Sequence, residues 1–216
     1  MRLHTSFSQS PVLYQRISHT ILFLFFICTS ATAQSYQQLI EEHRKNYKHE
    51  FLKDERSPLK KRDLRHLRFF KPDSSFCIRA SFTRISDTTG FIMKTHSGVD
   101  KHYYVYGELQ FYLKGTGHIL KVYQSEKLMK QKEFEDYLFV PFNDWTNNQS
   151  TFGGGRYLDF RMNDIQNGSL QLDFNKAYNP YCAYKGGYAC PIPPEENRLN
   201  LEITAGEMKY GREGSE

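Results

Sequence analysis

Apolar and polar residues alternate over much of this 216-residue chain. The clearest run begins at residue 76, where the apolar side chains at every second position are Phe76, Ile78, Ala80 and Phe82. A second run, residues 103–113, contains Gly107, which predicts a β-bulge. Helices place apolar residues three or four positions apart, whereas a period of two is typical of a strand with one buried face. The alternation therefore indicates an antiparallel sheet.

Turn-forming residues separate the predicted strands. Gly115-Thr116-Gly117 lies between residues 103–113 and 119–123, which predicts a hairpin. Further strands are expected at residues 91–93, 138–140, 170–174 and 199–203, the second of these ending at Pro141. Many short strands with turns between them predict a mostly β fold, an antiparallel sandwich or a barrel-like sheet.

One helix is expected, from Ser35 to about Phe51. Ser35 and Gln38 fit a capping box, and Pro58 follows the element. The apolar side chains at helical spacing, which we expect to pack on the sheet, are Tyr36, Leu39, Ile40, Tyr47 and Phe51.

Residues 1–33 have the pattern of a signal peptide. Arg2 and Arg16 precede an apolar run at residues 21–27, and Ala31-Thr32-Ala33 fits the motif cut by signal peptidase. A membrane anchor is the alternative, but the run is shorter than the roughly 20 residues that cross a bilayer. We therefore expect cleavage after Ala33, export to the periplasm or beyond, and one β-rich domain over residues 34–216 with no transmembrane segment.

Lipid attachment at Cys28 is a second alternative for the N-terminus. It is disfavoured because Phe25-Phe26-Ile27 places bulky residues where a lipoprotein signal has small ones.

Loss of Arg2 and Arg16 would lower the formal net charge from +5 to +3. A charge this small does not predict a nucleic-acid partner.

Three cysteines follow residue 33. The eight-residue spacing of Cys182 and Cys190 predicts a disulfide in an exported chain. Two reduced, buried thiols are the alternative. A zinc site is less favoured because the pair lacks CxxC spacing and a nearby histidine. Cys77 falls within an apolar alternation and is predicted to be a core residue.

The segment from Phe139 to Arg198 departs from the β pattern and predicts a long, ordered C-terminal loop region. It is rich in residues that hold or approach ligands, including Gly153-Gly154-Gly155, which allows close backbone approach. The candidate ligand-binding residues are Asp144, Arg156, Asp159, Asp173, Asn175, Tyr178 and Asn179. We expect all of these except Asp144 to converge in space, beside an opening at the glycine turn, because each is costly to bury alone.

Several blocks of this region resemble a known family. LFVPFNDWT, TFGGGRYLDF, LDFNKAYNPYCAY and CPIPPEENRLNLEITAGE are similar to the signature blocks of domain of unknown function family 1684. The upstream HRKNYKHEFL and YGELQFYL also resemble it, so the similarity covers nearly all of residues 34–216. One departure is Trp145, where a small residue is expected. The resemblance implies no catalytic residues.

Two functions and one structural role fit the candidate residues. The first function is non-catalytic binding of a small polar or carbohydrate-like ligand in the cell envelope, with tyrosines as stacking surfaces. The alternative is a hydrolase that uses Asp144 and Asp173 as acid and base, with Arg156 placing the substrate. The motifs G-x-S-x-G and H-E-x-x-H are absent, and no cofactor or metal is predicted. The structural role is an Arg–Asp pair and asparagines that hold the loops together.

Overall fold

The computed structural model describes residues 35–86 and 89–211. The predicted signal peptide lies outside these residues. The chain divides between Leu39 and Ile40 into two units, and the sheet and the candidate site belong to the second. None of the helices among the described residues has the length and apolar character to cross a bilayer.

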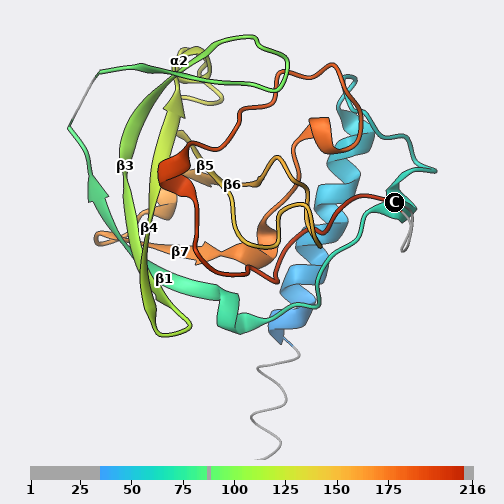
Figure 1. Cartoon of the computed structure of the whole chain (residues 1–216), viewed down its shortest axis with the longest axis horizontal. Helices are drawn as coiled ribbons and strands as arrows, with labels where there is room; N and C mark the ends of the chain where they lie inside the picture. The colour runs from blue at the N-terminus through green and yellow to red at the C-terminus, as the bar shows by residue number, and fades with distance from the viewer. Residues whose placement is uncertain (1–34, 87–88, 212–216) are drawn as a thin grey trace, which may run out of the picture. The chain divides into compact units, whose positions relative to one another are not determined.

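The described part of the chain forms one antiparallel sheet of seven strands (Figure 1). The strands are β1 Cys77–Arg84, β2 Phe91–Met93, β3 Lys101–Leu113, β4 Thr116–Ser125, β5 Tyr137–Phe142, β6 Arg156–Arg161 and β7 Ser169–Asp173. Their spatial order is β6-β5-β4-β3-β1-β7, with β2 also paired to β3. The sheet curls into a half-barrel, so the prediction of a mostly β, barrel-like fold is confirmed, as is the β3–β4 hairpin.

The helices are short apart from α1, which spans residues 35–53. The others are α2 Glu126–Met129 and the 3-10 turns Leu64–His66, Ser74–Phe76, Met162–Asp164, Phe174–Lys176, Tyr181–Ala183 and Glu195–Asn197. In α1, Ile40 and Phe51 are buried and Tyr47 is half-buried, as expected. The prediction for Leu39 is wrong, because its side chain is 54% exposed. Neighbouring helical residues point about 100° apart, so Leu39 falls beside the buried stripe that contains Ile40.

Gly107 forms the predicted bulge in β3, where the pairing with β4 shifts between Val105 and Gly107. A Cβ atom at Gly107 would lie 2.5 Å from the Phe82 ring and 2.6 Å from the Thr83 carbonyl oxygen. The extra residue moves odd-numbered positions to the other face of the sheet.

The bulge therefore lets β3 contribute to two separate apolar clusters. Past the bulge, Leu109 joins the larger cluster on one face of the sheet, where its neighbours include Leu120, Val122, Leu138, Val140, Leu158 and Leu172. Before the bulge, Tyr103 joins a second cluster on the opposite face, with Met93, Tyr123, Phe139 and Tyr157. Adjacent residues such as Val122 and Tyr123 belong to different clusters, as the pleat requires.

Three local expectations are wrong: the end of β5, the burial of Cys77 and a strand at residues 199–203. β5 does not stop before Pro141 but continues to Phe142. The missing N–H of Pro141 is tolerated because the side chain of Asn197 lies between β4 and β5 here: its Nδ2 donates to the carbonyls of Lys121 and Pro141, and its Oδ1 accepts from the Lys121 N–H. Cys77 is half-buried rather than in the core, since it lies on the polar face of β1.

The segment Leu199–Ile203 is not a strand, although its apolar side chains are buried. Its backbone bonds to the loop after β5, through Leu199 N–H to the Asn143 carbonyl and Trp145 N–H to the Leu201 carbonyl. The side chain of Arg156 donates a hydrogen bond to the carbonyl of Ile203. Period-two alternation indicates that one side of an extended segment is buried. It does not indicate whether the segment pairs with another strand.

Candidate functional site

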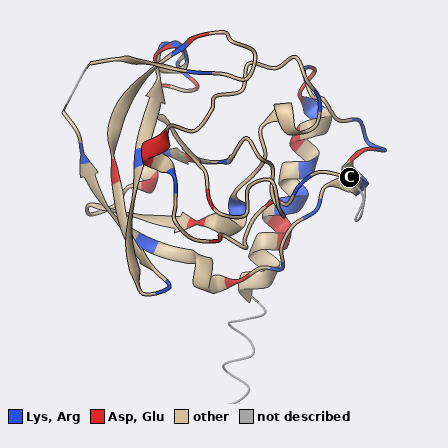
Figure 2. Ribbon diagram, in the orientation of Figure 1, with Lys and Arg blue, Asp and Glu red and all other residues tan. Residues whose placement is uncertain are grey.

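A cleft of about 1390 Å³ is bordered by both edge strands of the sheet, β6 and β7. Helix α1 supplies a third border through His43, Tyr47, Glu50 and Phe51, and the loop at residues 178–191 supplies a fourth. Acidic and basic residues are interspersed along α1 (Figure 2). The helix therefore presents no charge of a single sign to the cleft.

The polar face of β1 and β7 forms one wall of the cleft. Cys77 is opposite Asp173 and Arg79 is opposite Gln171, so these four side chains share a face. The Arg79 Nε donates to the Ser169 Oγ over 3.0 Å, and the Gln171 Nε2 donates to the Cys77 Sγ over 3.2 Å. This wall combines a guanidinium, an amide and a thiol within reach of a bound molecule.

Asp159 on β6 faces the cleft and is held by two tyrosine hydroxyls. Tyr137 donates to Oδ1 over 2.6 Å, and Tyr178 donates to both carboxylate oxygens over 2.8 Å. Tyr178 is placed by the backbone, because residues 157 and 178 exchange N–H···O bonds of 2.9 and 3.1 Å. The structure thus brings together two predicted site residues, Asp159 and Tyr178, and adds Tyr137.

The surroundings of Asp159 combine solvent contact with crowding. Its side chain is exposed to the cleft, yet protein atoms border the cleft on several sides. Removal of bulk water raises the pKa of the Asp159 carboxyl, and the hydrogen bonds from Tyr137 and Tyr178 and the charge of Arg161 oppose that rise.

A second carboxyl group, Glu207, lies fully buried close to the cleft wall. It accepts hydrogen bonds from the hydroxyls of Tyr47 and Tyr184, at 2.8–2.9 Å, and from the Asn179 N–H at 2.9 Å. Burial raises the pKa of Glu207 to about 7, against the opposing effect of these donors. The Tyr47 ring lies 6.0 Å from that of Tyr178, which connects this group to the Asp159 site.

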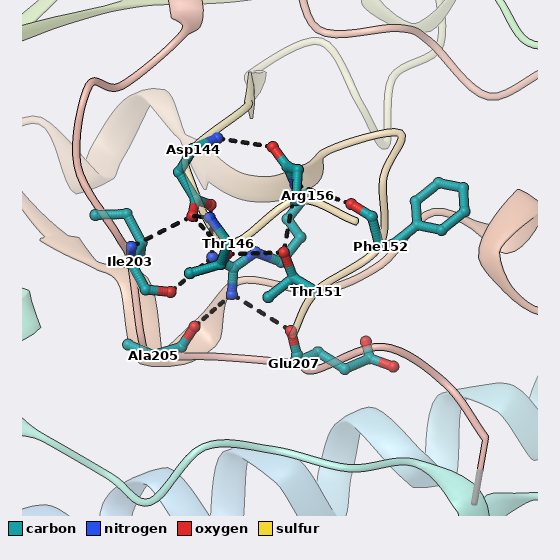
Figure 3. A network of polar contacts seen from close by, with 9 residues as sticks. Asp144, Thr146, Thr151, Phe152, Arg156, Ile203, Ala205 and Glu207 are labelled. Atoms are coloured by element: carbon teal, nitrogen blue, oxygen red, sulfur yellow. Dashed lines mark hydrogen bonds and ion pairs between the residues drawn. The ribbon is translucent and has the colours of Figure 1, made fainter. Parts of the chain in front are cut away.

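Arg156 and Asp144 form an ion pair away from solvent (Figure 3). The Arg156 Nη2 lies 2.8 Å from Asp144 Oδ2, and both side chains have no exposed area. The remaining contacts of the guanidinium hydrogens are the carbonyls of Ile203, Ala205 and Glu207. Burial lowers the pKa of Arg156, while the charge of Asp144 raises it. The geometry is that of a brace between β6 and the C-terminal segment, so we leave both residues out of the candidate site.

Asp173, Asn175 and Asn179 also make structural contacts. Asp173 accepts from the Asn175 N–H and side-chain amide over 3.0 Å, which caps a 3-10 turn. The Asn175 side chain also bonds both backbone groups of Asp73, over 2.8 and 2.9 Å. Asn179 donates to the Met208 carbonyl. The predicted set is therefore divided among separate clusters, although Asp173 still borders the cleft.

The glycine turn is packed against protein atoms. A Cβ atom at Gly153 would meet the Asn148 side chain at 1.8 Å, and one at Gly154 would meet the His96 ring at 2.6 Å. Gly155 has a φ of 85°, which favours glycine. None of the three borders the cleft described above. At this turn glycine allows close packing of the chain on itself.

Cys182 and Cys190 are joined by a disulfide, with Cα atoms 6.2 Å apart. The bond closes the loop that carries Tyr188 and Ala189 and fixes the chain directly before Pro191, and all three residues border the cleft. The Tyr157 hydroxyl donates to the Pro191 carbonyl and holds this loop to β6. Within residues 35–86 and 89–211, no group of three or more His, Cys, Asp or Glu side chains is placed to hold a metal ion.

Comparison with known proteins identifies the family. Residues 62–208 match the family described as "Protein of unknown function (DUF1684)". The chain belongs to the DUF1684 family. This agrees with the resemblance seen in the sequence blocks. Trp145, which departs from the expected small residue, is 57% exposed, so solvent accommodates the larger side chain.

The solved structures that are similar include the solution NMR structure of an uncharacterized protein from Haloarcula marismortui. It shares 28% identity with this DUF1684 chain, covers 82% of it and 96% of the archaeal chain, and has a TM-score of 0.62. The search of curated proteins found no match. The likeness extends the fold to an archaeal relative and brings no activity with it.

The sequence did not point to Tyr137, Tyr47 or Glu207. Tyr137 precedes an apolar strand, and Tyr47 lies on the buried stripe of α1, so both resemble core residues. Glu207 ends the block CPIPPEENRLNLEITAGE, and its place directly after a buried segment was the available signal. A carboxyl group there is costly to bury without donors.

Proposed function

We propose that this DUF1684 protein binds a small polar, carbohydrate-like ligand in the cleft, without catalysing a reaction. The observation that carries the proposal is Asp159, whose carboxylate faces the cleft and is oriented by Tyr137 and Tyr178. A carboxylate fixed in this way can accept further hydrogen bonds from a ligand. Tyrosine rings beside it offer apolar surface against which a sugar ring can pack.

The cleft is also large enough and polar enough to hold such a ligand. Its volume exceeds the roughly 300–1,000 Å³ common for small-molecule sites. Acidic and basic side chains both border it, among them Asp159 and Asp173, and Arg79 and Lys176. The hydrolase based on Asp144, Asp173 and Arg156 has less support, since Asp144 is bonded to Arg156 and neither side chain is exposed.

A thermal-shift screen tests the proposal. Neutral and charged monosaccharides, disaccharides and polyols are each added to the wild type, Asp159→Asn and Asp100→Asn, which changes an exposed aspartate. A ligand at 100 times its Kd stabilises by about 2.7 kcal/mol, so the wild type and Asp100→Asn should gain several degrees in Tm, and Asp159→Asn should gain less. If every stabilising compound acts equally on Asp159→Asn, the cleft is not the site. Conversion of a stabilising compound during incubation would favour the hydrolase.

We also propose that the protein is secreted and acts in the cell envelope. The signal-peptide pattern of residues 1–33 supports this, as does the disulfide Cys182–Cys190, since such bonds persist in oxidising compartments. Intact-mass measurement of the protein from an exporting bacterium should give the mass of residues 34–216 with one disulfide. A mass that retains residues 1–33 would contradict cleavage after Ala33.

A further inference from the structure

Asp159 has a negative charge that its protein neighbours do not neutralise. Tyr137 and Tyr178 orient the carboxylate but carry no positive charge. Among the described residues, no Lys, Arg or His nitrogen lies within ion-pair distance of Asp159. The charge of Arg161 reaches Asp159, but its guanidinium is bonded to Asp136 over 2.6 Å.

Aromatic rings surround this carboxylate. Phe139 is directly opposite Asp159 across the β5–β6 pair, so both side chains lie on the same face of the sheet. Tyr157, two residues earlier on β6, shares that face. Its ring is nearly perpendicular to those of Phe139 and Tyr178, with centroids 4.8 and 5.7 Å away. Because Tyr157 is only 5% exposed, the partly exposed Tyr178 is the ring that can meet a ligand in the cleft.

We infer that Asp159 and the ring of Tyr178 bind a cationic group of the ligand, an ammonium. The inference rests on the proposed function and narrows its ligand class. An ammonium supplies the counter-charge that Asp159 lacks, and aromatic faces attract cations through the ring quadrupole. A neutral hydroxyl would leave the charge uncompensated, and an anion would be repelled.

The smallest suitable probe is tetramethylammonium, because it fits a cleft of this volume whatever else the natural ligand carries. Its uncharged counterpart of similar size is tert-butanol. Each is titrated at pH 7 into protein with 13C-labelled tyrosine rings, at ionic strength held constant with sodium chloride. We expect saturable shifts of the Tyr178 ring signals with tetramethylammonium and at least tenfold weaker binding of tert-butanol.

Three variants separate charge from shape. Asp159→Asn should weaken tetramethylammonium binding at least tenfold, whereas Asp100→Asn should leave it unchanged. Tyr178→Phe keeps the ring but removes one donor to the carboxylate, so it should weaken binding less than Asp159→Asn does. The NMR spectrum of each variant shows whether the variant folds. If Asp159→Asn does not fold, the comparison of the two probes in the wild type still tests the inference.

Equal binding of the two probes, unchanged binding in folded Asp159→Asn, or no shift with tetramethylammonium would each overturn the inference. The proposed function is tested separately. If neutral sugars stabilise the wild type but not Asp159→Asn while tetramethylammonium does not bind, the cleft is still a polar site and only the ammonium is excluded.

Discussion

Several buried polar side chains in this protein take hydrogen bonds that backbone groups usually make. Asn197 bonds to Lys121 and Pro141 as a strand residue between β4 and β5 would. Arg156 collects three carbonyls of the C-terminal segment, and Asn175 bonds both backbone groups of Asp73. Because an amide or guanidinium offers several donors from one position, one side chain satisfies groups on two separate segments.

Replacement of Asn197 should therefore be costly. Asn197→Ala leaves the N–H and the carbonyl of Lys121 and the carbonyl of Pro141 without this partner, and we expect a loss of about 2–4 kcal/mol in the free energy of unfolding. Urea denaturation measures it, with Asn46→Ala on the exposed side of α1 as control. Asn197→Asp has nearly the same shape but cannot donate, so it should be at least as damaging. A loss within 0.5 kcal/mol, about that of an ordinary surface change, would contradict the bridging role.

Glu207 should make stability depend on pH. Burial raises its pKa from an ordinary 4.5 to about 7, so between these values the folded protein holds a proton that the unfolded chain releases. The stabilisation is complete below about pH 4.5 and is lost as pH rises through 7, by roughly 3 kcal/mol. Denaturation curves at pH 5 and pH 8 measure the loss, which should shrink in Glu207→Gln and persist in Glu202→Gln, an exposed control. If the free energy of unfolding falls equally between pH 5 and pH 8 in the wild type and in Glu207→Gln, Glu207 is not the source of the pH dependence.

At the scale of strands, one glycine decides how β3 is shared between the two apolar clusters. Gly107 inserts the extra residue that sends Tyr103 to one face and Leu109 to the other. It also allows the Phe82 ring to lie directly over the backbone. The bulge is therefore needed both for the register of β3 and for the packing of β1.

Gly107→Ala tests this. The new Cβ would meet Phe82 at 2.5 Å and the Thr83 carbonyl at 2.6 Å, and overpacking of this kind costs about 1–3 kcal/mol. Gly117→Ala in β4 is the control, because its nearest atom is at 3.5 Å, an ordinary contact. Adding Phe82→Leu should recover part of the loss and no more, since the Thr83 carbonyl is backbone. Equal stability of the two alanine variants would show that the bulge accepts a side chain.

The strands could be predicted because alternation reports one-sided burial directly. Gly107 was predicted to be a bulge for the same reason, since glycine inside a strand has few other roles. The segment 199–203 could not be assigned correctly, because its partners are the loop after β5 and the side chain of Arg156 rather than a strand. The candidate site was only partly predicted: Asp159 and Tyr178 meet, but whether a carboxylate faces a cleft or an arginine depends on contacts between distant residues.

At the scale of the whole molecule, the disulfide secures the loop that borders the cleft. Chain entropy predicts that the double substitution Cys182→Ser and Cys190→Ser lowers the free energy of unfolding by about 2–3 kcal/mol. Cys77→Ser, which changes a half-buried thiol outside the disulfide, is the control and should cost less. Urea denaturation gives both values. Thiol labelling of denatured, unreduced protein over residues 34–216 should find one reactive cysteine, Cys77, and three would disprove the bridge.

The Arg156 brace has a consequence for when the protein can fold. Every strand of the described sheet precedes residue 174, but three acceptors of the Arg156 guanidinium are the carbonyls of Ile203, Ala205 and Glu207. A growing chain that has just completed β7 would bury this cation with Asp144 alone. Residues 203–207 therefore supply the groups that make the buried charge tolerable, and the domain should acquire its stability only after Glu207 has left the ribosome. Such a delay keeps the chain unfolded, the state in which a polypeptide can still be threaded through a narrow channel.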